Sequence, residues 1–87
     1  MVPRVLVIEP YSDLREAIAL TLRREHYPCD AVADVADAAN EIGRHGYACV
    51  VVDGESTGAA VALLDPDARV VSLAKPFGRH ELLAALR

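Results

Sequence analysis

Short apolar runs rich in β-branched residues alternate in this sequence with segments of helical periodicity, and this alternation restricts the fold more than any other feature. The runs are 4–9 (RVLVIE), 29–33 (CDAVA), 47–52 (YACVVV) and 69–73 (RVVSL). Nearly all-apolar runs of this kind are typical of strands that are covered on both faces. Strands that alternate with helices favour a parallel sheet with helices on both faces and right-handed crossovers. The sequence therefore predicts an α/β fold, a doubly wound parallel sheet in the order βαβαβαβα.

The segments between the runs contain helix signals. Asp13 and Glu16 have the spacing of a capping box, and apolar residues recur behind them on one helical face. Asp34 is placed to cap a second helix, which we expect to end at Gly43 and Gly46. We expect a short third helix over 58–64 and a closing helix over 79–87, with Leu82, Leu83 and Leu86 facing the sheet.

Length and composition limit the class of protein. The 87 residues, of which 53% are hydrophobic and 25% charged, predict one globular domain over 1–87 and exclude a disordered chain. The net charge of -4 argues against a free-standing nucleic-acid binder, because no basic face exists to displace counterions from phosphates. No apolar run is long enough to span a bilayer.

The first residues contain no recognisable export signal, so we expect a cytoplasmic location. An unexported chain keeps its thiols reduced. We therefore interpret Cys29 and Cys49, which lack CxxC spacing, as small core residues.

Charged residues end or follow three of the predicted strands. Glu9 ends the first strand, Asp53 directly follows the third, and Lys75 comes shortly after the fourth. In open α/β sheets, ligands bind beyond the carboxyl ends of the strands. If the first and third strands are neighbours, two carboxylates and a lysine share one pocket.

At these positions the chain resembles the receiver domains of bacterial response regulators. The resemblance rests on VLVIE at 5–9, SDLREAIALTLRRE at 12–25, VVVDG at 50–54 and AKPF at 74–77, and it covers nearly the whole chain. It implies a flavodoxin-like receiver fold in a two-component phosphorelay. It also implies that Asp53 is the phosphoacceptor for a histidine kinase or phosphotransfer protein, that Lys75 contacts the phosphoryl group, and that Glu9, Asp53 and the backbone carbonyl of Glu55 hold Mg²⁺.

The chemistry requires such a set of charges. A carboxylate can attack phosphorus only if cations offset its repulsion from an anionic donor, and Mg²⁺ and Lys75 would supply them. Each residue alone also has an ordinary interpretation, because Asp53-Gly54 fits a turn and Lys75-Pro76 fits the start of a helix. Their joint order along the chain is the specific feature. We assign no chemistry to the three scattered histidines.

Two features depart from the family pattern. Pro10 stands where the family has its second acid, so we expect weak metal binding; Asp13 is a poor substitute because we expect it to cap a helix. The interval between Asp53 and Lys75 is also short by about one strand–helix unit, which leaves about four strands instead of five. The last strand therefore has two alignments: one makes Ser72 a candidate switch hydroxyl, and the other, which we favour, places Lys75 at the site.

The leading hypothesis is a receiver that is phosphorylated on Asp53 and signals to a downstream protein by contact. The alternative is a degenerate pseudo-receiver, a phosphorylation-independent interaction or dimerisation module. A small hydrolase of another type has little support, because no nucleophile motif or phosphate loop is present, and beyond Mg²⁺-dependent self-phosphorylation and dephosphorylation at Asp53 we expect no enzyme activity. Loss of one unit leaves an uncovered edge strand, which predicts a homodimer. We expect no nucleic-acid or membrane partner.

Overall fold

The strands of this chain form one parallel sheet. The computed structural model describes residues 4–87, except for the side chains of residues 55 and 56. The strands are β1 (Val5–Ile8), β2 (Cys29–Val32), β3 (Cys49–Val52) and β4 (Arg69–Ser72), in the spatial order β2-β1-β3-β4. All the pairs are parallel, and Val5 of β1 lies opposite both Cys29 and Cys49. The predicted α/β fold with a parallel sheet of four strands is confirmed.

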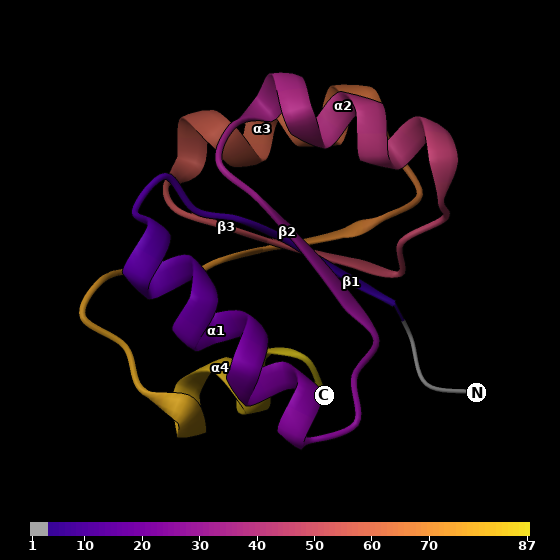
Figure 1. The fold of residues 1–87 in the computed structure, drawn as a ribbon. Coiled ribbons are helices and arrows are strands. Elements are labelled where there is room, and N and C mark those ends of the chain that lie inside the picture. Colours follow the sequence, from indigo (N-terminus) through magenta and orange to yellow (C-terminus); the bar gives the residue numbers. More distant parts are fainter. Residues whose placement is uncertain (1–3) are drawn as a thin grey trace.

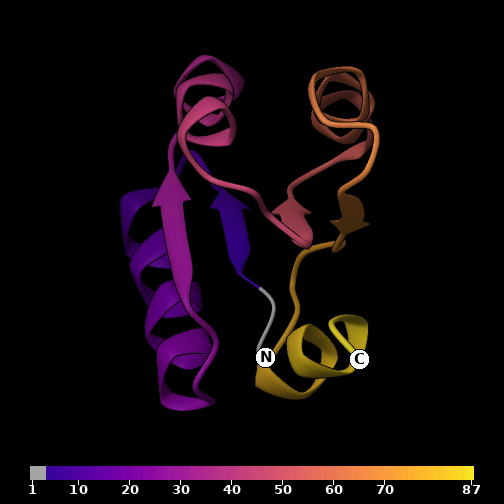
Figure 2. The ribbon, with the colours of Figure 1, turned by 90° about the vertical axis from the view of Figure 1, so that its right-hand side faces the viewer.

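Helices cover both faces of this sheet (Figures 1 and 2). They are α1 (Ser12–Arg24), α2 (Val35–Arg44), α3 (Glu55–Leu64) and α4 (Arg79–Ala85). α1 and α4 lie on one face, and α2 and α3 lie on the other (Figure 1). The sheet is therefore doubly wound, as the sequence predicts.

The two central strands, β1 and β3, separate two hydrophobic clusters. Val5 and Val7 of β1 pack with Ile18 and Leu22 of α1 and with the leucines of α4. Leu6 and Ile8 point to the other face, which α2 and α3 cover. Because side chains of a strand alternate between faces, a strand that is buried on both sides must be apolar throughout. This explains why these runs show no polar–apolar alternation.

The helix starts agree with the sequence signals only in part. The Asp34 cap is confirmed, since its Oδ1 accepts a hydrogen bond from the Asp37 amide at 2.8 Å. The predicted Asp13 cap is wrong: the N-cap residue is Tyr11, two residues earlier, and it makes no side-chain cap bond. Asp13 lies instead in the first turn, where a negative charge interacts favourably with the helix dipole. α2 ends at Arg44, between the two glycines, Gly43 and Gly46, that the sequence predicts to end it.

α3 lies across β3 and β4. A Cβ atom at Gly58 would be 3.5 Å from Val52 of β3 and 3.4 Å from Val70 of β4. Gly54 precedes the helix with a φ of 95°, a conformation that side chains disfavour. β4 is an outer strand of the sheet, and within residues 4–87 only β3 pairs with it. None of the helices described here has the length and apolar character needed to cross a membrane.

The α1 core contact gives a test of the fold. Leu22 is 0% exposed, whereas Leu20 on the same helix is 48% exposed. We expect Leu22→Ala to lower the free energy of unfolding by about 2–5 kcal/mol, through lost burial and the cavity that remains. Leu20→Ala should change it by no more than about 0.5 kcal/mol. Urea unfolding followed by circular dichroism measures both, and equal losses would contradict the assigned helix face.

Candidate functional site

Glu9 and Asp53 lie at the carboxyl edge of the sheet. Glu9 directly follows β1 and Asp53 directly follows β3, and the last residues of these strands, Ile8 and Val52, lie opposite each other. Glu9 is only 2% exposed, whereas the Asp53 side chain is 37% exposed. The register of two neighbouring parallel strands therefore brings one buried and one accessible carboxylate together.

Lys75 joins these two carboxylates. Its Nζ lies 2.6 Å from Oε1 of Glu9 and 2.9 Å from Oδ2 of Asp53. The hydrogen bond with Glu9, followed by the one with Asp53, raises the pKa of Lys75 above its ordinary value. The structure thus brings together the three charged residues that the strand ends predict. Their roles in phosphoryl transfer remain predictions.

Two residues that the sequence analysis missed support this group. The ring of Tyr11 lies 4.8 Å from Nζ of Lys75, within the range of a cation–π interaction. Arg15 of α1 donates a hydrogen bond to the backbone carbonyl of Glu9 at 3.0 Å and holds the loop that follows β1. Both contacts depend on how α1 packs beside the loop, and no spacing in the sequence indicates them.

A depression of about 190 Å³ opens beside Asp53. It is lined by Ile8, Pro10, Ala33, Asp34, Val35, Asp53 and Thr57. Asp53 thus borders an open depression. Pro10 contributes only an apolar wall, where an acidic side chain would have contributed oxygen atoms.

The oxygens of Glu9 and Asp53 suit Mg²⁺ in kind. Both carboxylates lie within 3 Å of the same lysine nitrogen, so their oxygens converge on a small volume. Mg²⁺ prefers such hard oxygen ligands and commonly uses one or two carboxylates together with water. Glu55, whose backbone carbonyl is the third predicted ligand, is the first residue of α3. The set fits the ion, but Pro10 leaves it one carboxylate short and Lys75 already pairs with both acids.

Ser72 lies outside this group of charges. It is the last residue of β4, lies opposite Val52 and is exposed. Within the described part of the chain, no hydrogen bond joins it to Asp53 or Lys75. The chain reaches the site three residues later, at Lys75. A role for Ser72 as a switch hydroxyl stays a prediction.

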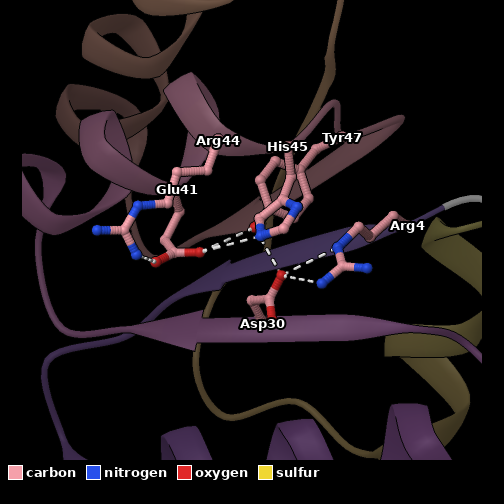
Figure 3. Close-up of polar contacts among 6 residues, drawn as sticks. All are labelled: Arg4, Asp30, Glu41, Arg44, His45 and Tyr47. Atoms are coloured by element: carbon pink, nitrogen blue, oxygen red, sulfur yellow. Dashed lines mark hydrogen bonds and ion pairs between the residues drawn. The ribbon is translucent and has the colours of Figure 1, made fainter.

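A second polar cluster lies near the amino ends of the strands, away from Glu9 and Asp53 (Figure 3). Oδ2 of Asp30 accepts hydrogen bonds from Arg4 at 2.8 and 3.0 Å and from the Tyr47 hydroxyl at 2.6 Å. Burial raises the pKa of Asp30, but the bonds from Tyr47 and Arg4 outweigh it and hold that pKa below its ordinary value. Burial, followed by the bond to Asp30, raises the pKa of Tyr47. The sequence analysis missed this cluster because its members come from separate elements.

This second cluster is also a possible metal site by its atom types. Ligand atoms of Asp30, Glu41 and His45 lie within 4.8 Å of one another. However, the Arg4 guanidinium already neutralises Asp30. Asp30 lies opposite Leu6, near the amino ends of the strands, so an ion bound there would not contact Asp53. This cluster is therefore separate from the carboxylates of Glu9 and Asp53.

Comparisons with known proteins identify the fold. No family model matches the sequence, and no curated protein matches it. Among solved structures, the chain is similar to the chemotaxis response regulator CheY4 of Vibrio cholerae, with a TM-score of 0.85 at 16% identity, covering 99% of this chain and 97% of that one. It is also similar to a CheY-like response regulator receiver domain from Methylobacillus flagellatus, with a TM-score of 0.81 at 18% identity and full coverage of both chains.

A third similar structure is a sensor protein from Polaromonas sp. JS666. Its TM-score is 0.84 at 21% identity, and the match covers 97% of this chain and 92% of that one. At identities this low the agreement is one of fold. The chain therefore has a flavodoxin-like α/β fold of the CheY-like receiver type, built on four strands.

The triad of Glu9, Lys75 and Asp53 predicts a measurable coupling. Lys75→Met should lower the urea midpoint, because it leaves the buried Glu9 carboxylate without its cation. Glu9→Gln should lower the midpoint less in the Lys75→Met background than in the wild type, because the partner is already absent. A control at the exposed Arg24, Arg24→Met, should have little effect. If the loss of urea midpoint in the double variant equals the sum of the two single losses, the contact between Lys75 and Glu9 contributes nothing to stability.

The raised pKa of Lys75 predicts a pH dependence. A lysine whose pKa is higher in the folded than in the unfolded state stabilises the fold fully below the unfolded value, here 10.5, and loses this effect as the pH rises through the folded value. The difference in urea midpoint between the wild type and Lys75→Met should therefore be constant between about pH 7 and pH 10 and shrink above about pH 10.5. The titration of Tyr47 affects the stability of both proteins equally, so it cancels in the difference between their urea midpoints. A difference that is unchanged up to pH 12 would contradict the pairing.

Proposed function

We propose that this chain, which has the receiver fold of response regulators, accepts a phosphoryl group on Asp53 from a histidine kinase or phosphotransfer protein and signals to a downstream protein by contact. One observation carries the proposal: Lys75 bridges Glu9 and Asp53 at the carboxyl edge of the sheet, beside a depression that exposes Asp53. The fold makes this edge the expected ligand site. The proposal includes a cytoplasmic location.

In the proposed reaction, a carboxylate oxygen of Asp53 attacks the phosphorus of a phosphohistidine. The bond between phosphorus and the imidazole nitrogen breaks, an acyl phosphate forms on Asp53, and the departing nitrogen takes up a proton. The Lys75 ammonium offsets the negative charge that gathers between donor and acceptor. Mg²⁺, when held by Glu9, Asp53 and the Glu55 carbonyl, would supply further positive charge, and we expect Pro10 to weaken its binding.

The second candidate function is a phosphorylation-independent interaction module. It is favoured by Pro10, which offers no side-chain oxygen to a metal, and by Lys75, which already pairs with both Glu9 and Asp53. In such a protein the triad would be structural. It would tie the segment after β4 to the centre of the sheet without any transfer chemistry.

We also propose that the protein forms a homodimer through the outer edge of β4. Within the described residues this edge has no neighbouring strand, and open edges pair readily with other chains. The net charge of -4 gives no support for a nucleic-acid or anionic membrane partner.

Intact mass after incubation with a small phosphodonor and Mg²⁺ tests the transfer. We expect a single phosphoryl adduct that is labile to base and that disappears in Asp53→Asn. Asp65→Asn, which changes an acid after α3, should keep the adduct. Pro10→Asp, which restores an acid beside Glu9, should increase both the yield and its dependence on Mg²⁺. The absence of an adduct in the folded wild type and in Pro10→Asp would instead favour the interaction module.

A further inference from the structure

The hydrogen bonds of β4 show which of its backbone groups have no partner among residues 4–87. The amide of Arg69 donates to the carbonyl of Ala48 at 3.0 Å, and the amide of Leu73 donates to the carbonyl of Val52 at 3.3 Å. Alternate residues of a strand direct their amide and carbonyl groups to opposite sides. The groups of Arg69 and Leu73 face β3, so those of Val70 and Ser72 face the open edge.

This alternation restricts how a second copy can pair. In an antiparallel pair, two residues that exchange both hydrogen bonds must each direct their backbone groups toward the other strand. We propose that two copies pair through β4 about a twofold axis at Val71, with Val70 opposite Ser72 of the second copy. This register uses both outward-facing residues of β4 from each copy. It joins the two sheets into one continuous sheet.

The position of α3 matches such a pairing. A twofold axis perpendicular to the sheet keeps α3 of both copies on the same face. α3 lies across β3 and β4, since Gly58 approaches both Val52 and Val70. With strands about 4.8 Å apart, helices centred between the last two strands of each copy would lie about 10 Å apart across the axis. Packed helices are separated by about 8–10 Å.

The side of α3 that would face this axis is apolar and exposed. Thr57 lines the depression together with Val35 of α2, so its side of the helix faces α2. At 100° per residue, Ala59 and Ala62 lie on the opposite side, toward the β4 edge, and both are exposed. The adjoining Leu63 is 86% exposed. Residues 58–64 of this helix are apolar on all sides, and such a helix segment is normally covered.

Several observations favour a second copy as the occupant of this surface. Residues 57–64 of α3 contain no charged side chain, so two chains of net charge -4 can meet here without like charges in contact. The partner must present an open strand edge that pairs antiparallel to β4 and, beside it, an apolar helix side. A second copy related by a twofold axis presents both surfaces in the required positions. This inference rests on the proposed homodimer and is independent of transfer to Asp53.

Sedimentation equilibrium over a range of concentrations, with circular dichroism to confirm folding, tests this interface. The wild type should be a dimer. Ser72→Pro removes an amide that faces the open edge and leaves the pairing with β3 intact. Ala62→Glu places two like charges across the axis. Each variant should raise the monomer–dimer midpoint at least about tenfold, whereas Ala84→Glu, on the exposed side of α4, should not.

A cysteine at position 71 tests the register. A non-hydrogen-bonded antiparallel pair has Cα atoms about 4.5 Å apart, within the range of a disulfide. Val71→Cys should form a covalent dimer under mild oxidation; Ala84→Cys and the wild type, with Cys29 and Cys49, should not. A dimer without this cross-link would overturn the register, and a dimer that tolerates both Ser72→Pro and Ala62→Glu would overturn the interface. A monomer at all concentrations would overturn the homodimer itself, and the Asp53 adduct would still report on phosphoryl transfer.

Discussion

The contact on which the site depends is the bridge that the Lys75 ammonium forms between Glu9 and Asp53. β1 and β3 are neighbouring strands, and their last residues, Ile8 and Val52, lie opposite each other. The acids that follow these two residues, Glu9 and Asp53, therefore lie side by side. Glu9 is 2% exposed, and a buried carboxylate without a partner is strongly unfavourable. Lys75, which lies far from Glu9 in the sequence, supplies the positive partner for this carboxylate. It thereby couples the segment after β4 to the two central strands.

Only α3 and β4 lie between Asp53 and Lys75, so β4 has two structural roles. The strand must complete the sheet beside β3, and the residues after it must deliver Lys75 to the site and lead the chain to α4 on the other face (Figure 2). β4 achieves both because it ends at Ser72 and leaves a short connection before Lys75. As a consequence, no element within residues 4–87 covers the outer edge of β4 or the adjacent side of α3. The apolar side chains of Ala59, Ala62 and Leu63 are exposed there.

The sequence predicted the element order and the convergence of charges because both follow from local patterns. Apolar runs such as 47–52 mark buried strands, and acids at strand ends must meet where parallel strands are neighbours. It failed at Asp13, because the first turn of a helix also favours acids and spacing alone does not fix the N-cap residue. It did not fix the alignment of the last strand, which requires tertiary pairing. The contacts of Tyr11 and the Asp30–Tyr47 cluster join separate elements and have no local signal.

The charge balance at the site relates the two candidate functions. Glu9, Asp53 and Lys75 together carry one excess negative charge, whereas an acid in place of Pro10 would have added a second. Loss of that acid lowers the affinity for a divalent cation, but it also lowers the repulsion that a cation must offset before a phosphoryl donor can approach. The Lys75 ammonium is charged at neutral pH, and its contacts with Glu9 and Asp53 raise its pKa further. Transfer to Asp53 in this chain would therefore depend more on Lys75 and less on Mg²⁺ than in a receiver with both acids.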